Sequence, residues 1–154
     1  MRPVLAAVAL FGMALGDPVT AQTLTPEIPN WNHPDIATVF PDPWSPTGAV
    51  IVYNPGTCQQ IGLACLFAKF HEHGHVALGH HFQPGVYRME QERDADRYAA
   101  TYAPPQAVLA AWHLFMSGGS SSDGTIYGTP QERARRLCLF AQQAGNWIGP
   151  VSCS

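Results

Sequence analysis

The stretch FHEHGHVALGHH, residues 70–81, carries five histidines and one glutamate within an otherwise apolar segment. The segment from Gln59 to His80 contains no proline and is apolar around much of its circumference, so the sequence predicts one long buried helix there. Burying several histidines in such a helix is costly unless a partner compensates for their lost hydration. The stretch therefore predicts a helix that carries a polar site into the core, and a bound metal ion would compensate for the burial.

His71, Glu72 and His75 satisfy the pattern H-E-x-x-H. Each helical residue turns by about 100°, so the two histidines lie about 40° apart on one face, one turn apart, where both imidazoles can reach one ion. Glu72 lies at the edge of that face, where a carboxylate can take a proton from a water activated by the metal. His73 points away from this face. The motif predicts a zinc site with His71 and His75 as ligands and Glu72 as the general base.

A catalytic zinc site needs a third protein ligand, and His81 is one candidate. It follows His71 by ten residues, as in the longer pattern H-E-x-x-H-x-x-G-x-x-H. Leu78 stands where that pattern has a glycine, and Gly79 comes one position late. Because a bulky residue is poorly suited to the left-handed turn that brings the third histidine round, the sequence weakens this alternative.

Glu92 is the favoured third ligand. Glu92 and Asp96 are four residues apart and share one face of a second helix, predicted at Arg88–Tyr102. One carboxylate could bind the metal while the other accepts the free N–H of a ligating histidine and fixes its tautomer. Small residues should let this helix pack closely against the first: Ala95, Ala99 and Ala100.

These motifs carry a family resemblance. HEHGH (residues 71–75) followed by ERDADRYAA (residues 92–100) resembles the gluzincin metallopeptidases with H-E-x-G-H and then E-x-x-A-D, the group of the CAAX prenyl endopeptidases, the HtpX-type proteases and their periplasmic relatives. The short interval between the motifs also resembles the compact ImmA/IrrE-type metallopeptidase domains, and the sequence does not separate the two groups. YGTPQERARRL (residues 127–137) resembles a later gluzincin segment in which His-Pro precedes an arginine-bearing helix, but Thr129 replaces the histidine.

The resemblance implies a zincin-like core with an active-site helix and a glutamate helix. Zinc would be held by His71, His75 and Glu92, with Glu72 as general base and Asp96 in support. Several side chains are possible donors to an oxyanion, and the sequence does not select among them: His80, His81, His113, Tyr98, Tyr102, Tyr127 and Arg133.

The function that the resemblance implies is a zinc-dependent endopeptidase that hydrolyses peptide bonds through an activated water. A peptide or protein substrate would be added to an edge strand at Ala49–Asn54. The alternative is a catalytically silent module that binds zinc or a partner and keeps the fold. A third interpretation is a small disulfide-stapled structural protein without a metal.

Residues 22–48 carry six prolines, which forbid a regular helix or a central strand. We expect an extended segment whose Trp31 and Trp44 dock on the domain, and a propeptide that covers the site is the alternative. Residues 49–154 should form the domain. Ala49–Asn54, rich in β-branched and aromatic residues, is the only convincing strand, so the predicted fold class is mainly α with a small β edge (α+β).

Three further segments complete the predicted chain. A helix at Pro105–Met116 follows the stop at Pro104 and Pro105, and residues 117–124 have the composition of a flexible loop. A last helix at Thr129–Gln143 should have Thr129 as N-cap, Pro130 at its first position and Glu132 completing a capping box.

Residues 1–21 are predicted to be a signal peptide. Arg2 supplies a positive start, Val4–Leu15 is an apolar run too short to span a bilayer, and cleavage is expected after Ala21. The expected location is therefore exported, periplasmic or extracellular, without a membrane anchor after cleavage.

Four cysteines in an exported chain predict disulfides. We favour Cys58 with Cys65 and Cys138 with Cys153. If Cys65 lay on a helix starting just after Cys58, the two would be roughly 10 Å apart, so Cys58 must fold back from a loop.

The net charge is −3 and only 12% of the residues are charged. The arginines form no stripe apart from the short cluster Arg133, Arg135 and Arg136, so a nucleic-acid partner or an anionic membrane surface is disfavoured.

Overall fold

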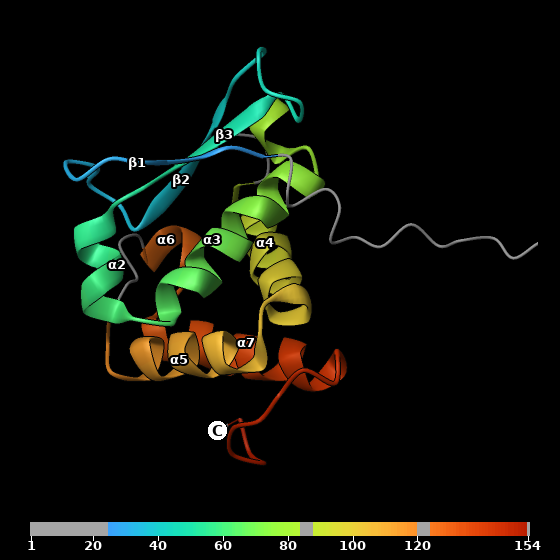
Figure 1. The fold of residues 1–154 in the computed structure, drawn as a ribbon. Helices are drawn as coiled ribbons and strands as arrows, with labels where there is room; N and C mark the ends of the chain where they lie inside the picture. The colour runs from blue at the N-terminus through green and yellow to red at the C-terminus, as the bar shows by residue number, and fades with distance from the viewer. Residues whose placement is uncertain (1–24, 84–87, 120–123, 154) are drawn as a thin grey trace, which may run out of the picture.

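The computed structural model describes residues 25–83, 88–119 and 124–153, and the predicted signal peptide with its cleavage after Ala21 lies outside them. The fold is mainly α-helical with one small sheet, as predicted (Figure 1). The strands are β1 (Glu27–Pro29), β2 (Ala37–Pro41) and β3 (Ala49–Tyr53). The helices are α2 (Pro55–Ile61), α3 (Ala64–Ala77), the 3-10 turn η1 (His80–Phe82), α4 (Arg88–Tyr102), α5 (Pro105–Met116), α6 (Gly124–Tyr127) and α7 (Pro130–Gln143).

The predicted strand at Ala49–Asn54 is confirmed as β3, but its predicted place at an edge is wrong. The strand order is β1-β3-β2, so β3 is central, parallel to β1 and antiparallel to β2. Ala49 and Ile51 are fully buried, which explains why an apolar strand occupies the middle of the sheet. Asn54 leaves the strand because its side chain caps α2.

The proline-rich segment is not a separate strap, because it supplies the two outer strands of this sheet. Pro29 and Pro41 lie at the ends of outer strands, where a missing N–H is tolerated. The expected docking of Trp44 is wrong, since 94% of it is exposed at the hairpin that projects at the top of Figure 1. Trp31 lies beside Gly56 but remains 63% exposed.

The predicted long helix is two helices, α2 and α3, separated by Gly62 and Leu63. Gly62 has φ 58°, a left-handed value that favours glycine, and it turns the chain between the two helices. The turn brings Cys58 back to Cys65, with 5.0 Å between their Cα atoms. The predicted pairing is confirmed, but Cys58 lies in helix α2 and not in a loop, and the break between the two helices is what allows the disulfide.

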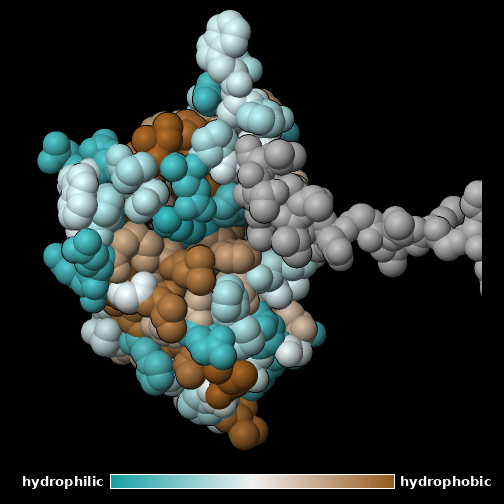
Figure 2. Space-filling view, in the orientation of Figure 1, coloured by the Kyte–Doolittle hydropathy of each residue, from teal (hydrophilic) through white to brown (hydrophobic). Residues whose placement is uncertain are grey.

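Helix α3 runs through the middle of the molecule, between the sheet and α5 (Figure 1). A salt bridge ties its sheet-facing side to β1, because Glu27 accepts hydrogen bonds from Lys69 Nζ at 2.8 Å and His73 Nε2 at 3.0 Å. Figure 2 shows hydrophobic side chains gathered in the middle of the visible face, in the region of α2 and α3.

Helices α3 and α4 approach closely at Gly74. A Cβ atom there would lie 3.1 Å from the Cα of Ala95 and 3.0 Å from the Cβ of Tyr98, so only glycine fits without displacement. The predicted packing of small α4 residues is confirmed, since these side chains are fully buried: Ala95, Ala99 and Ala100. This contact sets the distance between the histidines of α3 and the carboxylates of α4.

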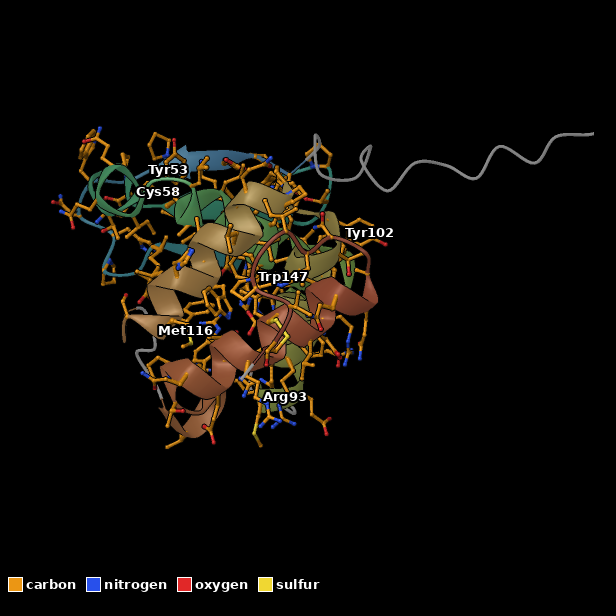
Figure 3. The ribbon with its side chains drawn as sticks, turned by 90° about the horizontal axis from the view of Figure 1, so that it is seen from below. Tyr53, Cys58, Arg93, Tyr102, Met116 and Trp147 are labelled. Atoms are coloured by element: carbon orange, nitrogen blue, oxygen red, sulfur yellow. A yellow bond between two sulfur atoms is a disulfide. The ribbon has the colours of Figure 1, made fainter. Side chains whose placement is uncertain are left out.

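The remaining helices close the core from below. α4 and α5 have the predicted bounds, and Thr129 with Glu132 forms the predicted capping box of α7. The pairing of Cys138 with Cys153 is confirmed and holds the C-terminal tail against α7. Trp147 of this tail packs on Trp112 of α5 and lies in the middle of the lower face (Figure 3).

Among the described residues, no helix combines the length and hydropathy that a bilayer crossing requires. The two disulfides indicate an oxidising, exported environment.

Candidate metal centre

Three side chains from two helices converge on one point. His71 Nε2 lies 3.1 Å from His75 Nε2 and 2.9 Å from Glu92 Oε2, and His75 Nε2 lies 3.4 Å from the same oxygen. The prediction that these residues form a group able to hold a metal ion is confirmed. It is the one such group of three or more found in the part of the chain that the structure describes.

The helical spacing explains this convergence. His71 and His75 are one turn apart on α3, and Glu92 and Asp96 are one turn apart on α4. The Gly74–Ala95 contact lies between the two pairs and holds them face to face. All four side chains are buried, and Asp96 is only 1% exposed.

Asp96 is the hydrogen-bond partner of His71 on the side away from the group. Its Oδ1 lies 2.9 Å from His71 Nδ1 and accepts a bond of 2.7 Å from Arg133 Nη2, while its Oδ2 accepts one of 3.0 Å from Arg133 Nε. The Arg133 guanidinium lies over the rings of Phe115 and Tyr127. The chain Arg133–Asp96–His71 therefore fixes the orientation of one histidine.

The charged side chains of this cluster shift one another's pKa toward the ionised forms. Burial lowers the pKa of His71, but hydrogen bonds with Asp96 and Glu92 outweigh it and raise the pKa to about 10. Burial raises the pKa of the Asp96 and Glu92 carboxyls. Arg133 and His71 outweigh this effect at Asp96, and His71 and His75 outweigh it at Glu92. The pKa of each carboxyl therefore lies well below its usual range. Without a metal, the cluster is thus a buried ion pair.

Glu72 lies beside the group and not within it. Its Oε2 accepts a 2.8 Å hydrogen bond from the backbone N–H of Val39 on β2, and burial raises the pKa of its carboxyl. The same cleft contains Glu72, His71 and His75.

His81, the alternative third ligand, does not join the group. The left-handed turn is present at Gly79, with φ 72°, one position later than in the longer histidine pattern. His81 then packs on Phe82 and lies near Gly48, and its buried Nε2 has no hydrogen-bond partner among the described residues. The residue that this turn returns to the site is His80, whose Nδ1 lies 3.0 Å from Nδ1 of His75.

Tyr127 was only one of several possible donors in the sequence, and the structure brings it to the group. Tyr127 lines the same cleft as Glu92, and its ring centroid is 6.5 Å from that of His71. Burial and the charge of Glu92 raise the pKa of this phenol. The short helix α6 that carries Tyr127 was not predicted. The sequence feature that could have indicated a buried segment here is the apolar pair Ile126-Tyr127 before Gly128 and the N-cap Thr129.

A cleft of about 740 Å³ opens on the group between β2, α3, α5 and α6. One part of its wall is apolar. The other part carries the candidate metal ligands and Glu72, together with His80, His81 and Arg88. Three of the side chains that the sequence offered as oxyanion donors do not line it: His113, Tyr98 and Tyr102. The apolar wall includes Ala64, Phe67, Ala111, Leu114, Phe115 and Ile126.

No protein-family model, curated protein or solved structure matches this chain. The resemblance to gluzincins therefore rests on the motifs alone.

Proposed function

We propose that this protein is an exported zinc-dependent endopeptidase, acting in a periplasm or outside the cell. The observation that carries the proposal is the convergence of His71, His75 and Glu92 beside Glu72 in an open cleft. Two imidazoles, a carboxylate and an adjacent second carboxylate are the side chains that metal-assisted hydrolysis requires.

The donor atoms suit zinc in number, type and separation. Zinc bonds to nitrogen and oxygen are about 2.0–2.1 Å, so the edges of its tetrahedron are about 3.3 Å. The three separations in the group, 2.9, 3.1 and 3.4 Å, are close to that length. His71, His75 and Glu92 would hold the ion and would leave room on it for water or substrate, as in catalytic sites.

When bound, zinc supplies a Lewis acid that polarises a peptide carbonyl and makes water a nucleophile near neutral pH. Glu72 takes the proton of the attacking water. The Val39 N–H occupies one oxygen of this carboxylate and fixes its orientation, so the other oxygen receives the proton. The raised pKa of Glu72 brings it toward the pH range in which a general base is most effective.

Tyr127 donates to the oxyanion that develops on the carbonyl oxygen. Its raised pKa keeps the phenol protonated, and it lines the cleft next to His71 and Glu72. Tyr127→Phe should lower kcat by about 10²-fold while zinc affinity changes little.

The substrate is a peptide in an extended conformation. β2 is an outer strand, and Ala37, Thr38 and Val39 line the cleft, so an added peptide would lie along β2 and pair with backbone groups other than the Val39 N–H, which Glu72 holds. Central β3 has no free edge for such pairing.

Glu72→Gln separates the enzyme from a silent zinc-binding module. The proposal predicts that this variant binds zinc as the parent does and hydrolyses no member of a peptide library that the parent cleaves. A zinc-loaded parent that cleaves no peptide would favour the module. A parent without zinc affinity would favour the metal-free ion pair.

Metal content of two further variants tests the ligands. Glu92→Ala should lose zinc, because one of three ligands is gone, whereas His81→Ala should retain it. The opposite pattern would assign the third ligand to His81.

A further inference from the structure

The second histidine of the group has an unusual partner. His75 Nδ1 lies 3.0 Å from Nδ1 of His80, and the two rings meet at 66° with centroids 5.1 Å apart. This contact exists because α3 ends at Ala77 and Gly79 turns left-handed, which folds His80 back toward the preceding turn.

Two nitrogens at this distance need one proton between them. For His75 to offer the lone pair of Nε2 to a metal, its neutral ring must carry its proton on Nδ1. That N–H then donates to Nδ1 of His80, which must accept. His80 therefore carries its own proton on Nε2, at the wall of the cleft that it lines.

The two histidines of the group are thus held differently. His71 donates to the Asp96 carboxylate, which Arg133 holds from its other side. His75 meets a ring nitrogen instead. Among the hydrogen bonds of the described residues, His80 is the partner found for Nδ1 of His75.

We propose that His80 is a positioning residue, which fixes the tautomer and ring orientation of His75 so that Nε2 faces the metal. This inference rests on the proposed zinc site. Partners of ligating histidines affect metal affinity by about 10–100-fold when removed, and they are most often carboxylates, carbonyls or water. Here an imidazole takes that role, which gives a function to a histidine outside H-E-x-x-H.

The test is zinc affinity measured by competition with a chromophoric chelator, for the parent, His80→Leu and His80→Asn. The asparagine carbonyl can replace Nδ1 as acceptor, whereas leucine cannot. We expect His80→Leu to raise the zinc Kd by about tenfold or more, and His80→Asn to stay within about threefold of the parent. Equal affinity of parent and His80→Leu, or equal losses in both variants, would overturn the proposal.

Nitrogen-15 NMR of the zinc-loaded parent provides a readout that does not depend on any variant. The proposal predicts a proton on Nδ1 of His75 and on Nε2 of His80, and the reverse assignment for His80 overturns it. A parent that does not bind zinc would refute the proposed function, whereas a parent that binds zinc with unaffected His80 variants refutes only the role of His80.

Discussion

Replacing Asp96 by alanine should reduce both the stability of the metal-free protein and its affinity for zinc. Asp96 is 1% exposed and makes three contacts, at 2.7 and 3.0 Å with Arg133 and at 2.9 Å with His71. Its removal leaves Arg133, a residue that is 7% exposed, buried without the Asp96 carboxylate.

The expected magnitude follows from that burial. Removing one member of a buried ion pair costs about 3–5 kcal/mol, because the other charge remains desolvated. His71 also loses the acceptor that orients its ring, so zinc affinity should fall by about 10–100-fold.

Urea unfolding followed by circular dichroism, in chelator and then in excess zinc, measures both effects. Asp94→Ala is the matched control, since Asp94 lies on the same helix but pairs with Arg97 at an exposed position. It should change the free energy of unfolding by no more than about 0.5 kcal/mol. A loss below about 1 kcal/mol for Asp96→Ala, or unchanged zinc affinity, would refute the reasoning.

Three further predictions concern the packing, the sheet and the tail. Gly74→Ala places a Cβ 3.1 Å from the backbone of α4. Zinc affinity should therefore fall about tenfold in a chelator titration, and the free energy of unfolding measured in chelator should fall by about 1 kcal/mol. The hydrogen bond from His73 lowers the pKa of Glu27 from 4.5 to about 2. This carboxylate therefore stabilises the fold above pH 4.5, the contribution disappears as the pH falls toward 2, and Glu27→Gln should flatten the stability profile measured across that range. Cys153→Ser opens the disulfide with Cys138, a loop of 15 residues, and should lower the free energy of unfolding by about 3 kcal/mol in urea titrations.

Local signals account for the parts of the fold that the sequence predicted. Proline at the start of α5 and the Thr129–Glu132 box at the start of α7 mark helix ends by the chemistry of a few neighbouring residues. The stop at Pro104 and Pro105 separates α4 from α5, and the predicted bounds of both helices were correct. The group of His71, His75 and Glu92 was also predictable, because each helix places residues four apart on one face.

Long-range contacts account for the parts that were missed. β1 and β2 are strands because they pair with β3, and no local pattern in a proline-rich segment indicates that pairing. The apolar pattern continues across Gly62, so only the fold-back to Cys65 reveals the break between α2 and α3. Tyr127 reaches the cleft beside His71 through the position of α6, which the sequence around it does not specify.

Anomalous diffraction at the zinc absorption edge, from crystals grown with zinc, tests the central claim most directly. The account predicts one strong peak about 2.1 Å from Nε2 of His71, Nε2 of His75 and a carboxylate oxygen of Glu92. A peak bound by His81 in place of Glu92, or no peak at this group, would contradict it.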